Sequence, residues 1–377
     1  MSISICRVCG REFFNKPLLV YKNMPKAAQH FPDANSLKNE TGVNLTVCQC
    51  SGCGLVQLSD DPVSYYREVI RAAAVSEIIK DFKTKQFANF IEKYSLKGKK
   101  IIEIGCGKGE FLSLLQPLDV KAYGLEYSEL SVKQCVKDGL NVSKEYLDSN
   151  SKKLDQGPFD AFLLLMFLEH IPAPNHALKG IYNNLTEDAV GLIEVPNFDM
   201  ILRKNLFSEF ISDHLLYFTK ETLQTTLSIN GFDIIDFSQT RDDYVISVVV
   251  KKRGKLDIMH FYDYQIKIES EINEFLSHFK EKSVAIWGAG HQALAIIALT
   301  RIADKIRYVI DSAPFKQGKY TPATHLPIVT PNTLRSDPVD AVVVMAASYS
   351  DEVVGIIQQS FSNTKVAILR DFGLEII

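Results

Sequence analysis

The spacing of hydrophobic residues along the chain predicts alternating strands and helices. Apolar runs at 101–104, 122–126, 159–166 and 189–195 indicate buried strands of a largely parallel sheet, because a strand covered on both faces loses its polar alternation. Apolar residues also recur at helical spacing, as in Phe82, Phe87 and Phe90. This alternation predicts an α/β fold with a doubly wound sheet.

A second set of elements follows towards the C-terminus. The segment from Leu256 to Lys282 predicts a long amphipathic helix, and the runs at 284–287, 306–311 and 340–346 predict a smaller Rossmann-like sheet. The first of these strands leads into Gly288-Ala289-Gly290. No fitting acidic partner is evident for this turn, so it is a weak dinucleotide signal and NAD is not predicted.

A glycine-rich turn after the strand at 101–104 is the main candidate for ligand binding. Alternate glycines let the backbone approach a ligand closely, and the following helix start offers unpaired N–H groups. An acid at the end of the next strand can accept hydrogen bonds from both hydroxyls of a ribose. The residues of this pattern are Glu103, Gly105, Gly107, Gly109 and Glu126. The Gly-x-Gly-x-Gly spacing points away from NAD, and an ordinary tight turn is the alternative.

This pattern resembles the S-adenosylmethionine (SAM) site of class I methyltransferases. In that resemblance the loop from Glu103 to Gly109 surrounds the methionine and ribose part of SAM, and Glu126 binds the ribose. The strand at 159–166 ends in Phe167-Leu168-Glu169-His170, where cofactor and substrate are expected. Glu169 and His170 resemble the Glu-His-Ile of the same enzymes, where they usually shape the pocket, and a direct catalytic role is the alternative. We therefore predict Phe167, Glu169 and His170 as cofactor-binding residues.

Two cysteine pairs at metal-ligand spacing lie near the N-terminus. Cys6-x-x-Cys9 and Cys50-x-x-Cys53 can each aim two thiolates at one ion, and four such ligands close a tetrahedral zinc site. A closed site has no position for substrate, so the Zn²⁺ is expected to be structural. Cys48 lies outside both pairs and is not expected to bind the metal.

Composition and charge narrow the class of partners. The 377 residues are 46% hydrophobic and 23% charged, which suits an ordinary globular protein with two or three domains. A formal net charge of −3 offers no basic field for nucleic acid or an anionic membrane. No membrane-spanning run or signal-peptide pattern is evident, so a cytoplasmic location is expected. The oligomeric state is left open.

A histidine before a helix cap is the candidate catalytic base. Thr219 can cap a helix that begins near Lys220, but capping does not explain Asp213 and His214 just before it. This segment resembles the Glu-His and Tyr-Phe pattern of bacterial deoxysugar C-methyltransferases, a family of nucleotide-sugar enzymes. That resemblance makes His214 the base, with Asp213 where the family has glutamate and Ile211 where it often has tyrosine. A structural role for His214 is the alternative.

Two further segments carry predicted substrate contacts. Tyr65, Tyr66 and Arg67 lie where the zinc module joins the next domain, and we predict a catalytic role for Tyr65 and substrate binding for the other two. Packing is the alternative for the tyrosines. Residues 312–328 resemble the Lys-Gln-Gly and Thr-Pro-Gly-Thr-His pattern of the same C-methyltransferase family. From this segment we predict diphosphate contacts or, alternatively, a solvated loop for Lys316, Lys319 and His325.

The resemblance covers nearly the whole chain and implies three domains. These are a zinc-binding module (1–70), a class I SAM-dependent methyltransferase domain (71–245) and a C-terminal Rossmann-like substrate-binding domain (246–377). The implied reaction is methyl transfer from SAM to a nucleotide-linked sugar in carbohydrate biosynthesis, at a carbon beside a keto group. An O-methyltransferase for a sugar or another nucleotide-linked metabolite is the close alternative. A non-catalytic nucleotide-binding protein on a SAM-fold scaffold is the other.

Overall fold

The chain divides into two compact units, Met1–Gly254 and Lys255–Ile377. The computed structural model describes residues 3–27, 31–67, 75–147 and 153–377. The predicted boundary between residues 245 and 246 is wrong, because it falls in a strand, β11 (Val245–Lys252), that pairs with the sheet of the first unit. The predicted boundary between residues 70 and 71 lies outside the described residues.

The larger sheet of the first unit has seven strands in the order β10-β11-β8-β7-β4-β5-β6. With β11, its strands are β4 (Lys100–Ile104), β5 (Lys121–Glu126), β6 (Val142–Lys144), β7 (Phe159–Leu165), β8 (Leu185–Pro196) and β10 (Phe232–Thr240). Strands β4 to β8 are parallel, whereas β11 lies antiparallel between β8 and β10. The strand order reverses at β4 and β7, so their carboxyl ends face the crevice where doubly wound sheets bind ligands.

Helices cover both faces of this sheet. On one face pack α1 (Glu77–Lys93), α2 (Glu129–Lys137) and the single turn η2 (Leu112–Leu115). On the other pack α3 (Pro174–Asn183) and α5 (Lys220–Ile229). Ile101 and Leu163 point to the first core and Ile102 and Phe162 to the second, which is the period of two that a strand requires. The helix predicted after the glycine turn is shorter than expected, since only η2 forms there.

Two local features fix the ends of these helices. The Thr219 side chain accepts the Thr222 N–H and the Thr222 side chain accepts the Thr219 N–H, which confirms the predicted cap of α5. The side chain of Ser76 likewise accepts the Ile79 N–H at the start of α1. A buried ion pair between Lys83 on α1 and Glu194 on β8 joins this helix to the sheet.

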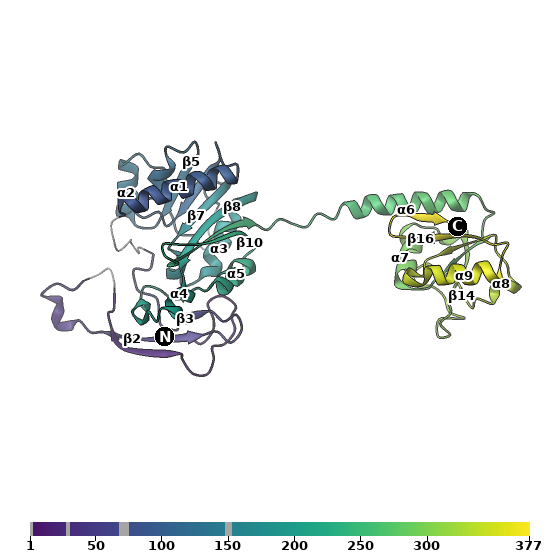
Figure 1. Ribbon diagram of the computed structural model, residues 1–377, viewed down its shortest axis with the longest axis horizontal. Helices are drawn as coiled ribbons and strands as arrows, with labels where there is room; N and C mark the ends of the chain where they lie inside the picture. Colours follow the sequence, from purple (N-terminus) through teal and green to yellow (C-terminus); the bar gives the residue numbers. More distant parts are fainter. Residues whose placement is uncertain (1–2, 28–30, 68–74, 148–152) are drawn as a thin grey trace. The chain divides into compact units, whose positions relative to one another are not determined.

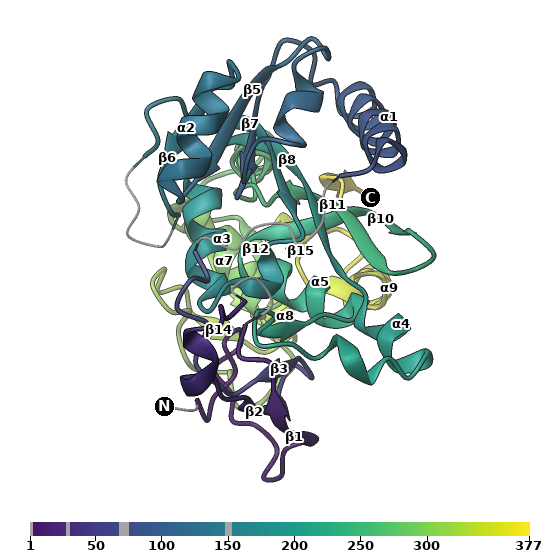
Figure 2. The ribbon, with the colours of Figure 1, turned by 90° about the vertical axis from the view of Figure 1, so that its left-hand side faces the viewer.

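A second, smaller sheet combines the N-terminal segment with a strand from much later in the sequence. Its order is β1-β2-β3-β9, and every pairing is antiparallel. The elements in and around it are β1 (Leu19–Met24), η1 (Ser36–Asn39), β2 (Val43–Gln49), β3 (Val56–Leu58), η3 (Leu168–His170), α4 (Phe198–Arg203), η4 (Phe207–Glu209) and β9 (Leu216–Tyr217). Its purple strands lie beside α4 (Figure 1), at the opposite end of the first unit from α1 and α2 (Figure 2).

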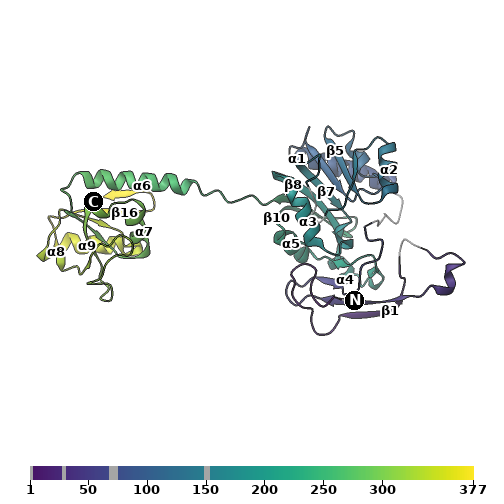
Figure 3. The ribbon, with the colours of Figure 1, turned by 180° about the vertical axis from the view of Figure 1, so that it is seen from behind.

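The second unit is a six-stranded sheet in the order β14-β13-β12-β15-β16-β17, parallel except for β17. Its strands are β12 (Val284–Trp287), β13 (Ile306–Ile310), β14 (Ile328–Val329), β15 (Ala341–Val344), β16 (Lys365–Leu369) and β17 (Leu374–Ile376). Its helices are α6 (His260–Ser277), α7 (His291–Leu299), η5 (Ala303–Lys305), α8 (Thr333–Ser336), η6 (Ala347–Tyr349) and α9 (Ser350–Ser360). The α6 and α7 helices cover one face, and α8 and α9 cover the other (Figure 3).

In the part of the chain that the structure describes, no helix combines the length and the apolar character needed to cross a membrane.

Candidate active site

The glycine-rich turn after β4 has the backbone conformation that its glycines predict. Gly105, Gly107 and Gly109 have φ angles of 71°, 57° and 81°, in the left-handed region that other residues rarely adopt. A Cβ atom on Gly109 would lie 2.3 Å from Cδ1 of Leu140, so the turn also packs closely against the chain before β6. A larger residue at this position would push the turn away from the sheet.

The carboxylate of Glu126 anchors this turn. Its Oε2 accepts the Gly107 N–H at 2.9 Å and its Oε1 accepts the Ser128 N–H at 2.8 Å. Glu126 ends β5 and is buried, as is Glu103 on the neighbouring strand β4. Each carboxylate oxygen has two lone pairs, so Glu126 can hold the turn and still accept hydrogen bonds from a diol.

A pocket opens beside this turn, with a composition suited to an adenosine group. Its apolar lining is Ile104, Leu125, Leu147, Phe167, Ile171 and Ala177. Gly105 and Glu126 complete one side, and a Cβ atom on Gly105 would lie 2.9 Å from the Phe167 ring. Among the predicted cofactor-binding residues, Gly105, Glu126 and Phe167 therefore line one pocket. An apolar slot with a carboxylate at its edge fits a base and its ribose.

Arg67 lies at this pocket, although we predicted it as a substrate contact. Its guanidinium carbon is 5.4 Å from the ring centroids of Tyr66 and Tyr127 and 4.9 Å from that of Tyr146. Its Nε also donates to the Tyr66 hydroxyl at 2.9 Å. Arg67, Tyr127 and Tyr146 all line the pocket that holds Glu126. Arg67 therefore lines the pocket beside Glu126, and Tyr66 contacts the Arg67 guanidinium, while their predicted role as substrate contacts stays a prediction.

The segment that carries Asp213 and His214 lies against the turn that follows β7. Nδ1 of His170 is 2.8 Å from the Asp213 carbonyl oxygen, and the Leu215 N–H donates to the Glu169 carbonyl at 2.8 Å. The His170 and His214 rings meet edge to face with centroids 4.6 Å apart. We predicted Glu169 and His170 as cofactor-binding residues, but neither is among the residues that line the pocket beside Glu126. The η3 turn directs them to His214 instead.

Desolvation keeps the imidazoles of this cluster neutral, although only His170 is buried and His214 keeps part of its surface exposed. Desolvation, followed by the nearby His170, lowers the pKa of His214 to about 3. Desolvation also lowers the pKa of His170. A neutral imidazole has a free nitrogen lone pair, so His214 is in the protonation state that a general base requires.

A broad groove lies over the small sheet, and Ser212 is one of its lining residues. Its lining includes residues 23–27, 39–45 and 60–65, and Tyr65 is therefore among them. The Ser212 hydroxyl donates to the Lys26 carbonyl at 3.0 Å, and the rings of Tyr21 and Phe210 lie 5.9 Å apart. The N-terminal segment thus contacts the loop that carries Asp213 and His214, and Tyr65 lies in the groove next to it.

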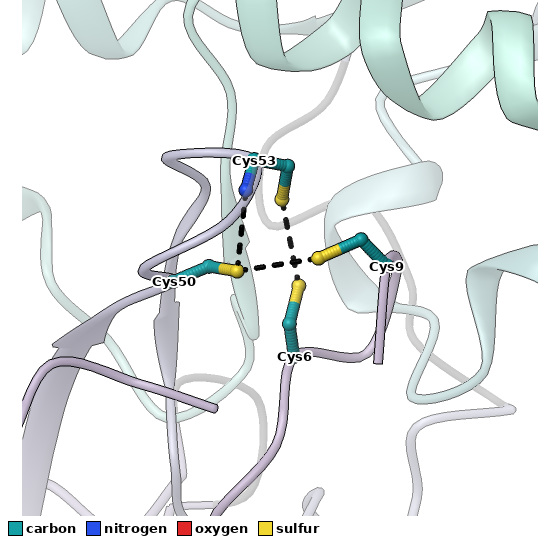
Figure 4. Close-up of side chains that lie close together, drawn as sticks. All are labelled: Cys6, Cys9, Cys50 and Cys53. Atoms are coloured by element: carbon teal, nitrogen blue, oxygen red, sulfur yellow. Dashed lines mark hydrogen bonds between the residues drawn. The ribbon is translucent and has the colours of Figure 1, made fainter. Parts of the chain in front are cut away.

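The four predicted metal ligands come together as a sulfur cluster (Figure 4). The Sγ atoms of Cys6 and Cys53 are 3.6 Å apart, those of Cys9 and Cys50 are 3.3 Å apart, and all four lie within 4.8 Å of one another. Tetrahedral zinc with Zn–S bonds of about 2.3 Å separates its sulfurs by about 3.8 Å. The donor set and its spacing fit that ion.

Two backbone N–H groups and one side-chain amide around the cluster support the sulfurs. The Val8 N–H lies 3.4 Å from the Cys6 Sγ, the Gly52 N–H lies 3.3 Å from the Cys50 Sγ, and Nε2 of Gln57 donates to the Cys6 Sγ at 3.2 Å. Donors of this kind stabilise thiolates in metal knuckles. Cys48 is outside the cluster, as expected.

The C-terminal unit has its own acid beside a glycine turn. Asp311 follows β13 and accepts the Ala289 N–H at 2.9 Å, so the acidic partner that the sequence did not reveal is present. Asp311 also binds the Lys316 ammonium at 2.8 Å, which leaves this lysine less available for a diphosphate than predicted. Lys319 and His325 are exposed.

Known proteins resemble the chain in both units. Residues 75–236 match a family model described as a methyltransferase domain, and residues 252–368 match one described as a C-methyltransferase C-terminal domain. The C-methyltransferase NovU of Streptomyces niveus is 23% identical over 389 aligned positions, which cover 93% of this chain and 91% of NovU. The protein is a SAM-dependent methyltransferase with the domain pair of the C-methyltransferase family.

Other relatives resemble only part of this methyltransferase. The ubiquinone biosynthesis O-methyltransferase of Pseudomonas entomophila is 30% identical over 96 positions, covering 24% of this chain and 41% of that enzyme. A solved structure of a SAM-dependent methyltransferase from Clostridium acetobutylicum is 15% identical, with a TM-score of 0.39, and covers 50% of this chain and 96% of that one. The match of residues 75–236 to a methyltransferase domain and the order of the seven-stranded sheet in the present chain agree with the class I methyltransferase fold that the sequence predicts.

Two tyrosines at the cofactor pocket of this methyltransferase were missed in the sequence. Tyr127 directly follows Glu126, so its place at the end of β5 was a usable signal. Tyr146 follows β6, a strand of three residues with an exposed face that gives no apolar run to recognise. Its position beside Arg67 depends on contacts between segments distant in sequence.

Proposed function

We propose that this enzyme transfers the methyl group of SAM to a carbon atom of a nucleotide-linked sugar, beside a keto group. The observation that carries this proposal is the likeness to the C-methyltransferase NovU along nearly the whole chain, together with the match to a C-methyltransferase C-terminal domain. The likeness to O-methyltransferases covers only 24% of the chain and does not extend to both units.

In this proposal His214 removes the proton from the reacting carbon. A C–H bond becomes acidic enough only when an adjacent carbonyl can take the charge as an enolate, so the reaction needs a ketone. His214 supports the role because burial lowers its pKa to about 3 and keeps the ring nitrogen available near neutral pH. Asp213 and Tyr65, next to His214 and in the adjoining groove, are proposed to orient the substrate.

The polar groups of the groove suit a sugar. Asn23, Asn44 and Ser64 are among its lining residues and can bind hydroxyl groups without a charge. For the diphosphate, Lys319 and His325 of the C-terminal unit remain our candidates, since both are exposed. Lys316 is a weaker candidate because of its ion pair with Asp311.

We also propose that Cys6, Cys9, Cys50 and Cys53 hold a structural Zn²⁺. Four thiolates fill a tetrahedral shell and leave no position for substrate, so the ion would stabilise the small sheet and not take part in the reaction. The sulfur spacing of 3.3 and 3.6 Å supports this assignment.

The experiment is methyl transfer to a 4-keto nucleotide sugar, followed by NMR of the product. We expect the new methyl group on carbon. In heavy water with S-adenosylhomocysteine, the hydrogen beside the keto group should exchange for deuterium. His214→Asn should bind SAM normally yet lose both reactions by about 10²-fold or more, because the amide cannot accept the proton.

The matched control is His176→Asn, which removes an exposed imidazole from α3 and should leave both rates unchanged. A methyl group on oxygen would show an O-methyltransferase. A fully active His214→Asn enzyme would exclude this histidine as the base.

A further inference from the structure

Glu169 has an unusual environment for a carboxyl group. Its side chain is 0% exposed, and neither Oε1 nor Oε2 has a hydrogen-bond partner among the described residues. Buried polar groups are nearly always hydrogen-bonded, so a carboxyl group in this state needs an explanation. The Leu215 N–H donates a hydrogen bond to the Glu169 carbonyl, so the backbone that carries this side chain is tied to the neighbouring segment.

Two imidazoles converge on this carboxyl group. Oε1 of Glu169 is 3.9 Å from Nε2 of His170. A carboxylate oxygen of Glu169, a ring nitrogen of His170 and a ring nitrogen of His214 all lie within 4.8 Å of one another. The Nδ1 of His170 faces the Asp213 carbonyl, where a neutral imidazole must place its proton as a donor. The Nε2 of His170, which lies 3.9 Å from Oε1 of Glu169, is therefore the nitrogen that carries the lone pair.

Desolvation acts in opposite directions on the acid and the base of this cluster. It raises the pKa of Glu169 to about 8 and lowers the pKa of His214 to about 3. A proton placed on His214 is therefore unstable, whereas a proton on the Glu169 carboxylate is stable. One shared proton in the cluster has its lowest free energy on Glu169.

Two phenols nearby do not compete for this proton near pH 8. Burial raises the pKa of Tyr217 on β9 and of Tyr244 before β11, so both phenols stay neutral. The Tyr244 hydroxyl donates to Oε2 of Glu209 on η4 at 2.8 Å, and that acid is not part of the cluster. Asp213 belongs to the same loop as His214 and contacts His170 through its carbonyl.

We propose that Glu169 is a positioning residue that accepts, from His214, the proton that this histidine removes from the substrate. This inference rests on the proposed function of His214 as the base. The proton passes from the His214 ring to the Glu169 carboxylate beside His170, either directly or through one bridging water. Glu169 thus lets a weakly basic histidine act as a base without remaining charged in an apolar site.

Proton removal, methyl transfer and proton relay together conserve atoms and electron pairs. The C–H bond of the substrate breaks, its proton goes to the His214 nitrogen, and its electron pair becomes the enolate. The enolate carbon then bonds to the methyl group of SAM, and the sulfur keeps the pair of the broken C–S bond. The N–H bond of His214 breaks as an O–H bond forms on the Glu169 carboxylate, which later releases the proton to solvent.

The first test needs no substrate. A difference infrared spectrum of the full-length enzyme between about pH 7 and about pH 9 should show loss of a carboxylic acid carbonyl band. The band should be absent in Glu169→Gln and present in the control Glu221→Gln, which removes an exposed acid from α5. A Glu169→Gln spectrum that keeps the band would overturn the inference, whatever the enzyme methylates.

The second test is the pH dependence of methyl transfer. In wild type the turnover rate should rise as pH passes through about 8, because Glu169 must be ionised to accept a proton. Glu169→Gln should retain SAM affinity and product, lose about 10²-fold in turnover, and lose this rise, whereas Glu169→Asp should recover part of it. An unchanged pH profile in Glu169→Gln would overturn the role. His214→Asn separately reports on the base itself.

Metal content is the remaining control. Two histidines and a carboxylate also match the ligands of some divalent cations. If wild type binds a second equivalent of metal and Glu169→Gln does not, the cluster is a metal site and the inference is overturned. Equal metal content in wild type and Glu169→Gln agrees with it.

Discussion

At the scale of single residues, burial of ionisable side chains determines the chemistry around His214. The residue types were visible in the sequence, since Glu169 and His170 follow an apolar strand and His214 precedes a helix cap. Their contact was not predictable, because no periodicity indicates which of two distant loops will pack together. Local signals identified the groups, and tertiary packing decided their partners.

The pH dependence of stability should show the buried acid. The folded-state pKa of Glu169 is about 8, above its ordinary value near 4.5, so the native state holds a proton that the unfolded state releases. The contribution of the Glu169 carboxyl to the free energy of unfolding is fully present below about pH 4.5 and is lost as the pH rises to 8. His214, whose pKa falls to about 3, has the opposite effect below its ordinary value of 6.5.

Between about pH 6.5 and 8 the Glu169 carboxyl should lower the free energy of unfolding of wild type by about 2 kcal/mol relative to Glu169→Gln, a difference from which groups common to both proteins, such as Cys9, cancel. Urea unfolding of both proteins at the two pH values measures this difference. A Glu169→Gln variant that loses stability as steeply as wild type would contradict the assignment.

Glu126 should matter for the cofactor and for the turn that holds it. Glu126→Ala removes the acceptor of the Gly107 and Ser128 N–H groups, as well as the proposed ribose contact. Leaving such donors without partners costs about 1–3 kcal/mol, so SAM should bind roughly tenfold more weakly or worse. Calorimetry on folded protein measures this, with the exposed Glu129→Ala on α2 as the matched control. Equal affinity in both variants would place the ribose elsewhere.

At the scale of elements, the sequence predicted the strands and caps better than the turns. The strands around the glycine turn and the cap at Thr219 follow from local patterns, and both are present. Asp311 was missed because its hydrogen bond to the Ala289 N–H joins segments that are separated by a whole helix, α7. The same reason explains why β9, only two residues long, was not assigned to the small sheet.

The cysteine cluster should account for the metal and for the stability of the small sheet. Purified enzyme should contain about one equivalent of zinc, because the cluster supplies one four-thiolate shell. Cys6→Ser should lose most of this metal and lower the melting temperature. Cys48→Ser, a buried cysteine outside the cluster, should keep the metal. Metal analysis and thermal unfolding decide the matter, and equal zinc in the two variants would rule out the site.

At the scale of the whole molecule, the chain forms two units in which the N-terminal cysteine segment shares a unit with the larger sheet. The sequence predicted the Rossmann-like character of the C-terminal unit but ended the methyltransferase domain too early. The reason is that β10 and β11 form an antiparallel hairpin, which lacks the helix that marks each earlier strand. A pattern based on strand and helix alternation stops at α5 and cannot place the last two strands.

The position of the boundary can be tested by shortening the chain. A protein ending at Gly254 should fold and bind SAM, because it retains β11 between β8 and β10. A protein ending at Tyr244 lacks this strand, leaves two sheet edges unpaired and should aggregate or unfold at low temperature. Circular dichroism and SAM calorimetry compare the two. Equal stability would mean that β11 is dispensable.

The pairing of β3 with β9 sets an order of events during protein synthesis. Gln57 leaves the ribosome 159 positions ahead of Leu216, the residue it pairs with. At about 5–20 residues per second, one edge of β3 therefore waits roughly 10–30 seconds for its partner strand. An exposed strand edge is prone to pair with other chains, so this interval is when the nascent enzyme most needs a chaperone.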